Sequence, residues 1–214
     1  MRIDATKVIA HLDQARMRAL AGDPEGIHDV RSASRRLRVW LEFKGHPALQ
    51  EELRWLGHAL ARARDLEVFK GALTMVAQTE LRAPAMTAAA NALQSKRWLA
   101  LREELERVKA PKTAKAKRAL PRLEKKLKKS RAALAPGDGN AIHRLRRAVR
   151  RLRYAREWME LEAKELATEQ ERLGAVCDLL ALRAFAERHG AEVPSTLAAG
   201  MGSALELSGG KGKE

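Results

Sequence analysis

The chain of 214 residues carries 42 Lys and Arg against 27 Asp and Glu, a formal net charge of +15 at pH 7. Hydrophobic residues make up 45% of it, which excludes a disordered polycation. Only eight residues are aromatic and only 20 are Val, Ile or Thr, so the composition disfavours a β-sandwich or barrel. The abundance of Ala, Leu, Arg, Glu and Lys predicts an all-α fold.

The sequence also argues against disulfide bonds, cysteine-based zinc sites and membrane-spanning segments. Cys177 is the single cysteine, so neither an intrachain disulfide nor a cysteine-based zinc site can form. No apolar run approaches the ~20 residues that span a bilayer, and the N-terminus lacks a signal-peptide segment. We therefore expect a cytoplasmic protein without a membrane partner.

Proline, glycine and capping residues divide the chain into predicted helices. Asp23 before Pro24 is a typical helix start, and Pro121 either kinks the fifth helix or marks its true start. The third helix is long enough to bend or break around residues 63–66. Further breaks are expected at Gly45–Pro47, Pro84, Pro111, Pro136–Gly139 and Pro194. The predicted helices are 3–20, 24–44, 48–80, 86–109, 112–134, 139–160, 162–189 and 195–206, followed by a disordered tail at 208–214.

The positive charge is concentrated in the second half. Residues 1–109 have 19 basic and 14 acidic residues, whereas residues 110–214 have 23 and 13. Lys112–Arg131 contains ten Lys and Arg against Glu124 alone. Such an excess indicates an anionic partner; the alternative is a solvated helix face that only keeps the protein in solution.

An internal repeat organises the chain. Ile27–Arg38 matches Ile142–Arg153 at an offset of 115, with eight of twelve positions identical. Leu60–Leu66 aligns with Leu173–Leu179 at an offset of 113, so Asp65 and Asp178 correspond. Two ordered matches predict two homologous halves, 1–109 and 110–207. We expect each of the two aspartates to pair with an arginine and orient it.

The repeat places basic side chains along one side of a helix. At about 100° per residue, each set covers roughly 80° of arc and about 15 Å of axis. The sets are His28, Arg31, Arg35 and Arg38, and His143, Arg146, Arg150 and Arg153. A helix selected for stability would interleave Glu among these cations. Because arginine offers a planar fork of donors to phosphate oxygens, the stripes predict an extended, multiply charged anion as ligand.

These motifs resemble the CHAD domain (conserved histidine α-helical domain). Ile27–Arg38 with Leu60–Val68 is similar to its first half, and His143–Tyr154 with Leu173–Asp178 to its second. The resemblance implies one domain over 1–207, with two pseudo-symmetric four-helix bundles forming a basic central groove or pore. It implies inorganic polyphosphate as ligand, polyphosphate granules as location, and a fused or neighbouring triphosphate-processing tunnel enzyme as partner. Ala61 and Cys177 depart from the family pattern, which more often has Gly and Asn there.

The resemblance and the stripes together predict the polyphosphate-binding residues. Arg97 lies in a basic helix that resembles a pore-lining helix of the family, and Lys115–Lys129 would be the equivalent segment. The predicted set is His28, Arg31, Arg35, Arg36, Arg38, Arg62, Arg64, Arg97, Lys125, Lys129, His143, Arg146, Arg147, Arg150, Arg153 and Tyr154.

Other interpretations remain open. His28 and His143 could be metal ligands, but no clustered acid or thiol accompanies them, or they could simply pack near a helix start. No catalytic or nucleotide-binding motif is present, so we expect neither catalysis nor a cofactor. Trp40, Trp55, Trp98 and Trp158 are expected in the core. The competing functions are non-specific nucleic-acid binding, a structural scaffold, and a metal- or phosphate-binding accessory module of a triphosphate-processing enzyme.

Overall fold

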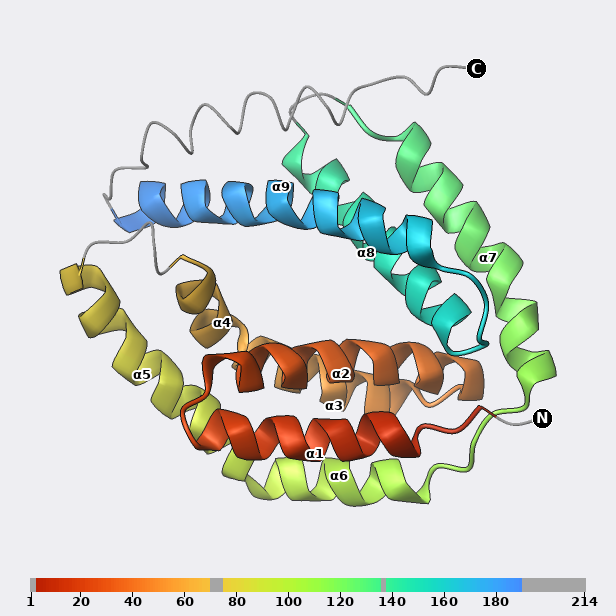
Figure 1. The fold of residues 1–214 in the computed structure, drawn as a ribbon, viewed down its shortest axis with the longest axis horizontal. Coiled ribbons are helices and arrows are strands. Elements are labelled where there is room, and N and C mark those ends of the chain that lie inside the picture. Colours follow the sequence, from red (N-terminus) through yellow and green to blue (C-terminus); the bar gives the residue numbers. More distant parts are fainter. Residues whose placement is uncertain (1–2, 70–74, 136–137, 190–214) are drawn as a thin grey trace. The chain divides into compact units, whose positions relative to one another are not determined.

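The structure, a computed structural model, describes residues 3–69, 75–135 and 138–189. These described residues form nine helices and no strand, so the all-α prediction is confirmed (Figure 1). The helices are α1 (Thr6–Leu20), α2 (Pro24–Lys44), α3 (Pro47–Ala59), α4 (Ala61–Val68), α5 (Met75–Gln94), α6 (Lys96–Arg107), α7 (Thr113–Ala132), α8 (Gly139–Glu157) and α9 (Lys164–His189).

The contacts between residues divide the chain into two compact units. Unit 1 is Met1–Lys117 and unit 2 is Arg118–Glu214. Each is described by itself below. The relationship between the half-repeats 1–109 and 110–207 stays a prediction from the sequence.

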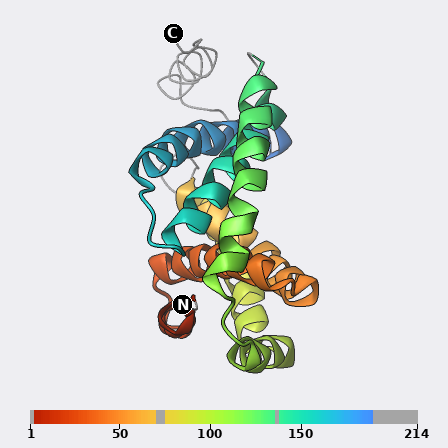
Figure 2. The same cartoon turned by 90° about the vertical axis from the view of Figure 1, so that its right-hand side faces the viewer.

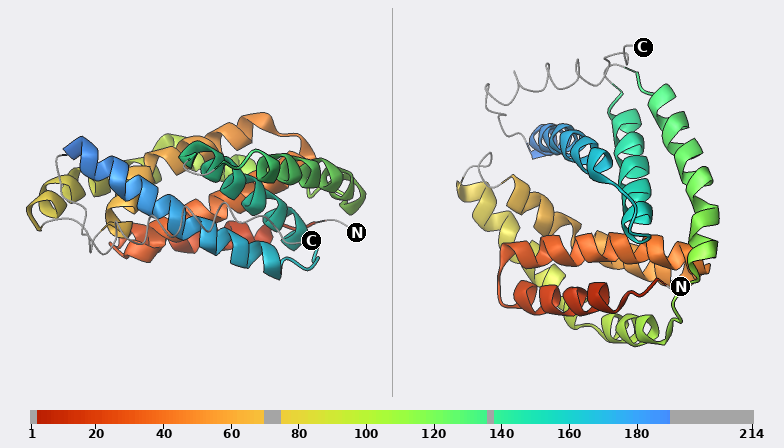
Figure 3. Two further views of the ribbon diagram at one scale, coloured as in Figure 1. Left: turned by 90° about the horizontal axis from the view of Figure 1, so that it is seen from above. Right: turned by 45° about the vertical axis from the view of Figure 1, so that its right-hand side comes forward.

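Unit 1 begins with an antiparallel pair of helices, α1 and α2, which lie side by side in Figures 1 and 3. The turn between them contains Gly22 at φ 85°, and Asp23 caps α2 by accepting a hydrogen bond from the Glu25 N–H at 2.9 Å. Arg18 ties the turn together through Asp23 at 2.7 Å and Asp29 at 2.9 Å.

Close contact between α1 and α2 depends on Gly26. A Cβ atom at that position would lie 2.3 Å from the Ala19 backbone nitrogen, so only glycine allows this approach. Apolar residues at helical spacing complete the core of unit 1. They include Leu12, Ala15, Ile27, Val30, Leu37, Trp40, Leu53, Leu56, Leu93, Trp98, Leu101 and Leu105. This packing fixes the orientation of α2 and therefore of its polar side.

Unit 2 is built from α7, α8 and α9. α7 runs beside α8, as Figures 1 and 2 show, and α9 packs on α8. The ion pair between Arg131 of α7 and Glu169 of α9 has an N–O distance of 2.5 Å. Asp138 caps α8 by accepting a hydrogen bond from the Ala141 N–H at 2.8 Å. The buried apolar residues include Leu123, Leu127, Ile142, Leu145, Val149, Leu152, Leu173, Cys177, Leu182 and Ala186.

The third and fourth predicted helices differ from the observed ones. The expected helix 48–80 is interrupted at Leu60, before the predicted bend at 63–66, and gives α3 and α4. α5 runs through the expected break at Pro84, whose ring is exposed to solvent while Ala85 and Ala89 are buried. The break falls instead at Ser95, whose hydroxyl caps α6 by accepting from the Trp98 N–H at 3.1 Å.

α7 continues through Pro121, so this proline does not mark the start of the helix. The predicted helix 195–206 and the tail 208–214 lie outside the described residues. Within the part of the chain that the structure describes, none of the helices combines the length and the apolar character needed to cross a bilayer.

Candidate functional site

Four cationic side chains of unit 1 form what we call the α2–α4 face. His28, Arg31 and Arg35 lie on α2, and Arg64 lies on α4. All four are half-buried. Arg35 and Arg64 both lower the pKa of Arg31, so they are close enough to it to repel its charge. The structure therefore brings residues of two predicted motifs onto one surface.

Arg31 is held by the end of α3. Its Nη1 donates a hydrogen bond to the carbonyl oxygen of Gly57, one of the last four residues of that helix. Such terminal carbonyls lack partners within the helix and carry the negative end of its dipole, so a guanidinium stabilises them. Burial, followed by repulsion from Arg35, lowers the pKa of Arg31 to about 10, although Asp65 opposes the shift. Arg31 thus makes a structural contact with α3 and is also partly exposed to solvent.

His28 lies among these arginines. Burial lowers its pKa below the ordinary value of 6.5, and Arg64 and Arg35 lower it further, while Glu25 and Asp29 oppose them. Glu25 also contacts Arg64, with an N–O distance of 3.7 Å. The histidine is thereby kept neutral at pH 7, and it can take up a proton when an anion offsets the arginines.

The second cluster, the α8 face, consists of His143, Arg146, Arg147 and Arg150 in unit 2. Arg146 is oriented by α9, because its Nη1 lies 3.5 Å from Asp178 Oδ1. Gly174 makes room for it: a Cβ atom there would lie 3.3 Å from Arg146 Nη2. Burial raises the pKa of the neighbouring Cys177 thiol, although a hydrogen bond with Arg146 opposes that shift.

His143 is the counterpart of His28. Burial lowers its pKa, and Arg146 and Arg147 lower it further, while Asp178 opposes them. The two histidines at equivalent repeat positions thus both lie among guanidinium groups, although His28 is half-buried and His143 is exposed. Asp178 pairs with Arg146 as predicted, and Asp65 acts electrostatically on Arg31, so its pairing with an arginine stays a prediction.

Sequence reasoning missed the two glycines that position Arg31 and Arg146. Gly57 supplies a carbonyl, and Gly174 supplies space. For Gly174, the available signal was a glycine inside a helical pattern, which costs about 1 kcal/mol relative to alanine and so indicates a packing or functional reason. Gly57 gives no such signal, because only its backbone carbonyl is used and a Cβ atom there would meet nothing within 4 Å.

Arg97 lies outside both faces. It forms two hydrogen bonds with Glu52, at 2.6 and 3.1 Å, and its guanidinium lies 4.1 Å from the ring centroid of Trp55. Trp55 is therefore a half-buried platform for an arginine, and its predicted place in the core is wrong, as it is for the half-buried Trp158. Trp40 and Trp98 are buried as predicted.

At the C-terminal end of α8, Arg153 pairs with Glu157 at 2.6 Å and lies 5.6 Å from the ring centroid of Tyr154. Tyr154 is only 4% exposed, and its repeat equivalent Val39 is 6% exposed. The structure thus places Tyr154 in the core rather than on a surface that a ligand reaches. Arg36 and Arg38 continue α2 as half-buried residues, and Arg62 is exposed on α4.

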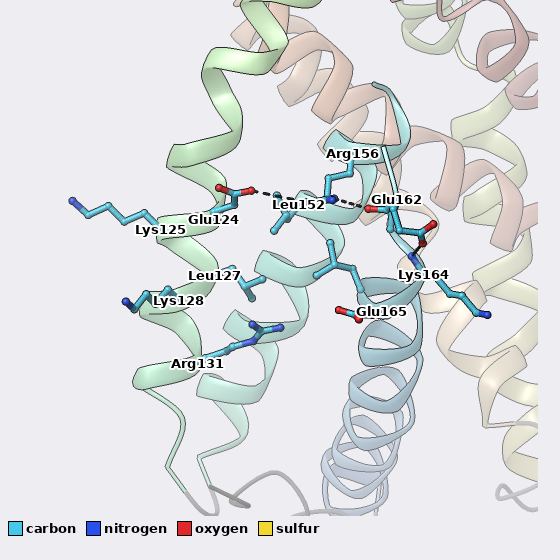
Figure 4. A pocket seen from close by; sticks show the side chains of 12 residues that line it. Glu124, Lys125, Leu127, Lys128, Arg131, Leu152, Arg156, Glu162, Lys164 and Glu165 are labelled. Carbon is cyan, nitrogen blue, oxygen red and sulfur yellow. Dashed lines mark hydrogen bonds and ion pairs between the residues drawn. The ribbon is translucent and has the colours of Figure 1, made fainter. Parts of the chain in front are cut away.

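Lys125 and Lys129 lie on α7, where both are exposed. A pocket of about 870 Å³ separates part of α7 from α8 and the start of α9 (Figure 4). Two of its cations are paired within unit 2: Arg131 pairs with Glu169, and Arg156 contacts Glu124 at 3.9 Å. Figure 4 shows the ammonium groups of Lys125 and Lys128 pointing away from α8. The structure therefore does not join these lysines to the α8 face.

The described residues contain no group of three or more His, Cys, Asp or Glu side chains that could hold a metal ion. Within each face, arginine and histidine side chains lie near carboxylates, which are Glu25, Asp29 and Asp65 in the α2–α4 face and Asp178 in the α8 face. The arrangement can hold anionic oxygens by charge-assisted hydrogen bonds, which is the chemistry of phosphate recognition.

Comparisons with known proteins give the family and the fold of the chain. The chain is similar to the crystal structure of the CHAD domain from the plant Ricinus communis, with 25% identity and a TM-score of 0.70, over 94% of this chain and 82% of that one. It is also similar in fold to PptA from Streptomyces chartreusis, with 18% identity and a TM-score of 0.67, over 95% and 93% of the two chains. No curated protein matches it. The CHAD-domain model matches residues 4–187, and the chain belongs to the CHAD-domain family.

Proposed function

We propose that this protein binds inorganic polyphosphate, without catalysis, through the α2–α4 face and the α8 face. The observation that carries the proposal is the environment of His28 and His143. In each unit the equivalent histidine lies among arginines: burial and then these arginines lower its pKa, while the local carboxylates oppose them. A bound polyanion relieves the repulsion that these arginines exert.

The geometry favours a linear anion over a single phosphate. The cations of α2 and those of α8 each follow one helix over about two turns, and arginines predominate in both faces. A chain of linked phosphates presents closely spaced charges along such a line, and each added contact benefits from the high effective concentration set by the previous one. Orthophosphate and pyrophosphate should therefore bind much more weakly than long chains.

Calorimetric titration with polyphosphates of increasing length tests the proposal. Affinity should rise with chain length and fall steeply with salt, because binding releases counterions. Duplex DNA at equal phosphate concentration should compete poorly for the two faces. Affinity that is equal for pyrophosphate and long chains, or flat over a several-fold change of salt, would contradict the proposal.

A matched variant separates a defined site from general charge. Arg35→Ala and Arg107→Ala remove the same charge from unit 1, but Arg107 is exposed on α6 and pairs with Glu103 and Glu104. Only Arg35→Ala should weaken polyphosphate binding. Equal effects of the two variants would show that net charge, rather than the α2–α4 face, holds the ligand.

The proposed cellular location and partner enzyme rest on the family resemblance and not on the geometry of the two faces. A binding protein of this kind would act in the cytoplasm at polyphosphate granules, with a triphosphate-processing tunnel enzyme as partner. Imaging a tagged copy in cells with and without polyphosphate tests the location. Co-purification with such an enzyme tests the partner.

A further inference from the structure

A third cationic surface lies on α7 in unit 2. Its members, which we call the α7 outer face, are Arg118, Arg122, Lys125 and Lys129. They fall within about 60° of arc at 100° per residue, and they extend over about 16 Å of helix axis. All four are exposed. None of the four forms an ion pair with another of the described residues.

No described residue of unit 2 forms an ion pair that offsets this charge. Arg118 and Arg122, and then Lys125 and Lys129, are like charges four residues apart, which destabilise a helix. The one acidic residue between Lys112 and Arg131 is Glu124, which lies on another side of α7 and contacts Arg156 of α8 at 3.9 Å. An uncompensated local cost of this kind favours a role in binding.

The α7 outer face and the α8 face lie on different sides of unit 2. α7 turns its buried residues Leu123 and Leu127 inward, and Leu127 shares the pocket of Figure 4 with Leu152 of α8. Leu152 lies about 120° around α8 from Arg146 and about 160° from Arg150. The side of α8 that faces α7 is therefore not the side that carries its arginines, so the two sets of cations are separate surfaces.

The shape of the α7 outer face restricts its partner. Its helix cannot insert into a lipid surface, because Leu123 and Leu127 are each only 4% exposed. α7 has no aromatic residue on which the bases of a single strand could stack. Arg146 of the α8 face lies beside α9, whereas all four side chains of the α7 outer face are exposed. Such a convex line of exposed side chains does not enclose a thin, flexible chain. It fits a rigid partner that supplies its own regular row of phosphates.

We propose that the α7 outer face binds the phosphate backbone of duplex nucleic acid, without sequence preference and independently of the polyphosphate faces. Duplex DNA carries one phosphate per strand about every 3.4 Å along its axis, so a 16 Å line of cations covers several phosphates. The lysines and arginines act as point charges with flexible stems, which is enough for contact that does not read bases.

The test compares two variants with the same change in charge. In the first, Arg118, Arg122, Lys125 and Lys129 are all changed to Gln. In the control, four exposed cations outside the three surfaces, Arg54, Lys96, Arg107 and Arg183, are changed to Gln. Fluorescence anisotropy with a short mixed-sequence duplex gives the affinity at several salt concentrations. Loss of four phosphate contacts should reduce the slope of log affinity against log salt by roughly 3 to 4 in the first variant.

The expected result is a reduced slope in the α7 variant, a nearly unchanged slope in the control, and unchanged polyphosphate affinity in both. Equal losses in the two variants would overturn the proposal, because net charge would then explain the binding. Loss of duplex binding in Arg35→Ala and Arg150→Ala instead would assign the duplex to the polyphosphate faces and also overturn it. Loss of binding to anionic vesicles, with duplex binding intact, would assign the surface to membranes.

Two further measurements keep the comparison interpretable. Thermal melting by circular dichroism shows whether the α7 variant is folded. The double variant Arg118→Gln with Arg122→Gln removes half of the charge and should reduce the slope by about half as much. Because polyphosphate affinity is measured on the same samples, failure of the duplex proposal is distinguishable from failure of the polyphosphate proposal.

Discussion

Arg146 of α8 and Asp178 of α9 lie 3.5 Å apart, measured from Nη1 to Oδ1. The side chains are 28% and 48% exposed, so solvent screens the pair and it adds little to stability. Its consequence is orientation: the aspartate holds the guanidinium across the groove between the two helices, next to Gly174. A substitution at Gly174 therefore tests how the orientation of Arg146 affects binding, separately from stability.

Gly174→Ala should weaken polyphosphate binding without lowering stability. The new Cβ atom would lie 3.3 Å from Arg146 Nη2, so the flexible guanidinium must shift by a few tenths of an ångström and its oriented contact is weakened. At the same time, alanine favours a helix over glycine by about 0.5–1 kcal/mol. We expect an unchanged or slightly higher melting temperature together with a several-fold weaker polyphosphate affinity, measured by calorimetry.

Gly57→Ala is the matched control. It makes the same change inside α3, where a Cβ atom would meet nothing within 4 Å, and the carbonyl that accepts from Arg31 is retained. Both affinity and stability should therefore stay close to, or slightly above, those of the wild type. If Gly57→Ala reduced the affinity as much as Gly174→Ala, displacement of Arg146 would not be the cause.

Polyphosphate binding should take up protons near neutral pH. Burial and then the neighbouring arginines lower the pKa values of His28 and His143 below 6.5, so both are neutral in the free protein at pH 7. Bound phosphate raises these pKa values, and affinity should therefore increase as the pH falls from about 7.5 to 6. Calorimetry in buffers of different ionisation enthalpy measures the uptake.

The double variant His28→Gln with His143→Gln controls for protonation of the polyphosphate itself. It should bind with less proton uptake than the wild type, whereas the contribution of the ligand's terminal phosphates remains. If the double variant took up as many protons on binding polyphosphate as the wild type does, the histidines would not be the source of the uptake.

The stability of the free protein gives a second check on the direction of the histidine pKa shifts. Because the folded-state pKa values are lowered, the unfolded chain binds more protons, and stability should decline as the pH falls below about 6.5.

The sequence predicted helix content and the basic stripes well because both depend on local chemistry. Asp23 caps α2 as predicted, and the Arg146–Asp178 pair follows from the repeat. Helix boundaries between 48 and 109 were less predictable. Pro84 is tolerated inside α5 because its ring faces solvent, and Ser95, a plain capping residue, begins α6. Whether a proline interrupts a helix or a serine begins one depends on which side of the helix is exposed. The residue type alone does not specify that side.

The candidate site was predictable as a set of charges but not as a set of contacts. Arg97 belongs to a basic segment, yet Glu52 and Trp55 hold it outside the two faces. Tyr154 follows Arg153 in the motif but is buried. Lys125 is part of a basic segment, as the stripe residues are, but it lies on the α7 outer face. Partners on other helices decide each case, and a single sequence does not show them.

Arg31→Ala should destabilise the free protein. The side chain donates to the Gly57 carbonyl at the end of α3, so its removal leaves that acceptor without the guanidinium. A hydrogen bond from a charged group contributes about 1.5–3 kcal/mol, and relief of repulsion from Arg35 offsets part of this loss. A melting temperature several degrees below that of the wild type is expected in thermal unfolding. An unchanged value would show that the contact with α3 contributes no stability.

Arg35→Ala and Arg150→Ala should have the opposite effect, with weaker binding and little change in stability. The two residues are equivalent in the repeat, and each lies at the centre of its stripe. Arg35 lowers the pKa of Arg31, so its removal relieves repulsion in the free protein. Each guanidinium should contribute roughly 1.5–3 kcal/mol to phosphate binding. Lys at either position should restore only part of the affinity, because it keeps the charge without the planar fork. Melting temperature and polyphosphate affinity, measured for both single variants and for the double variant, test this prediction. A large fall in melting temperature with binding intact would show that these arginines stabilise the fold instead.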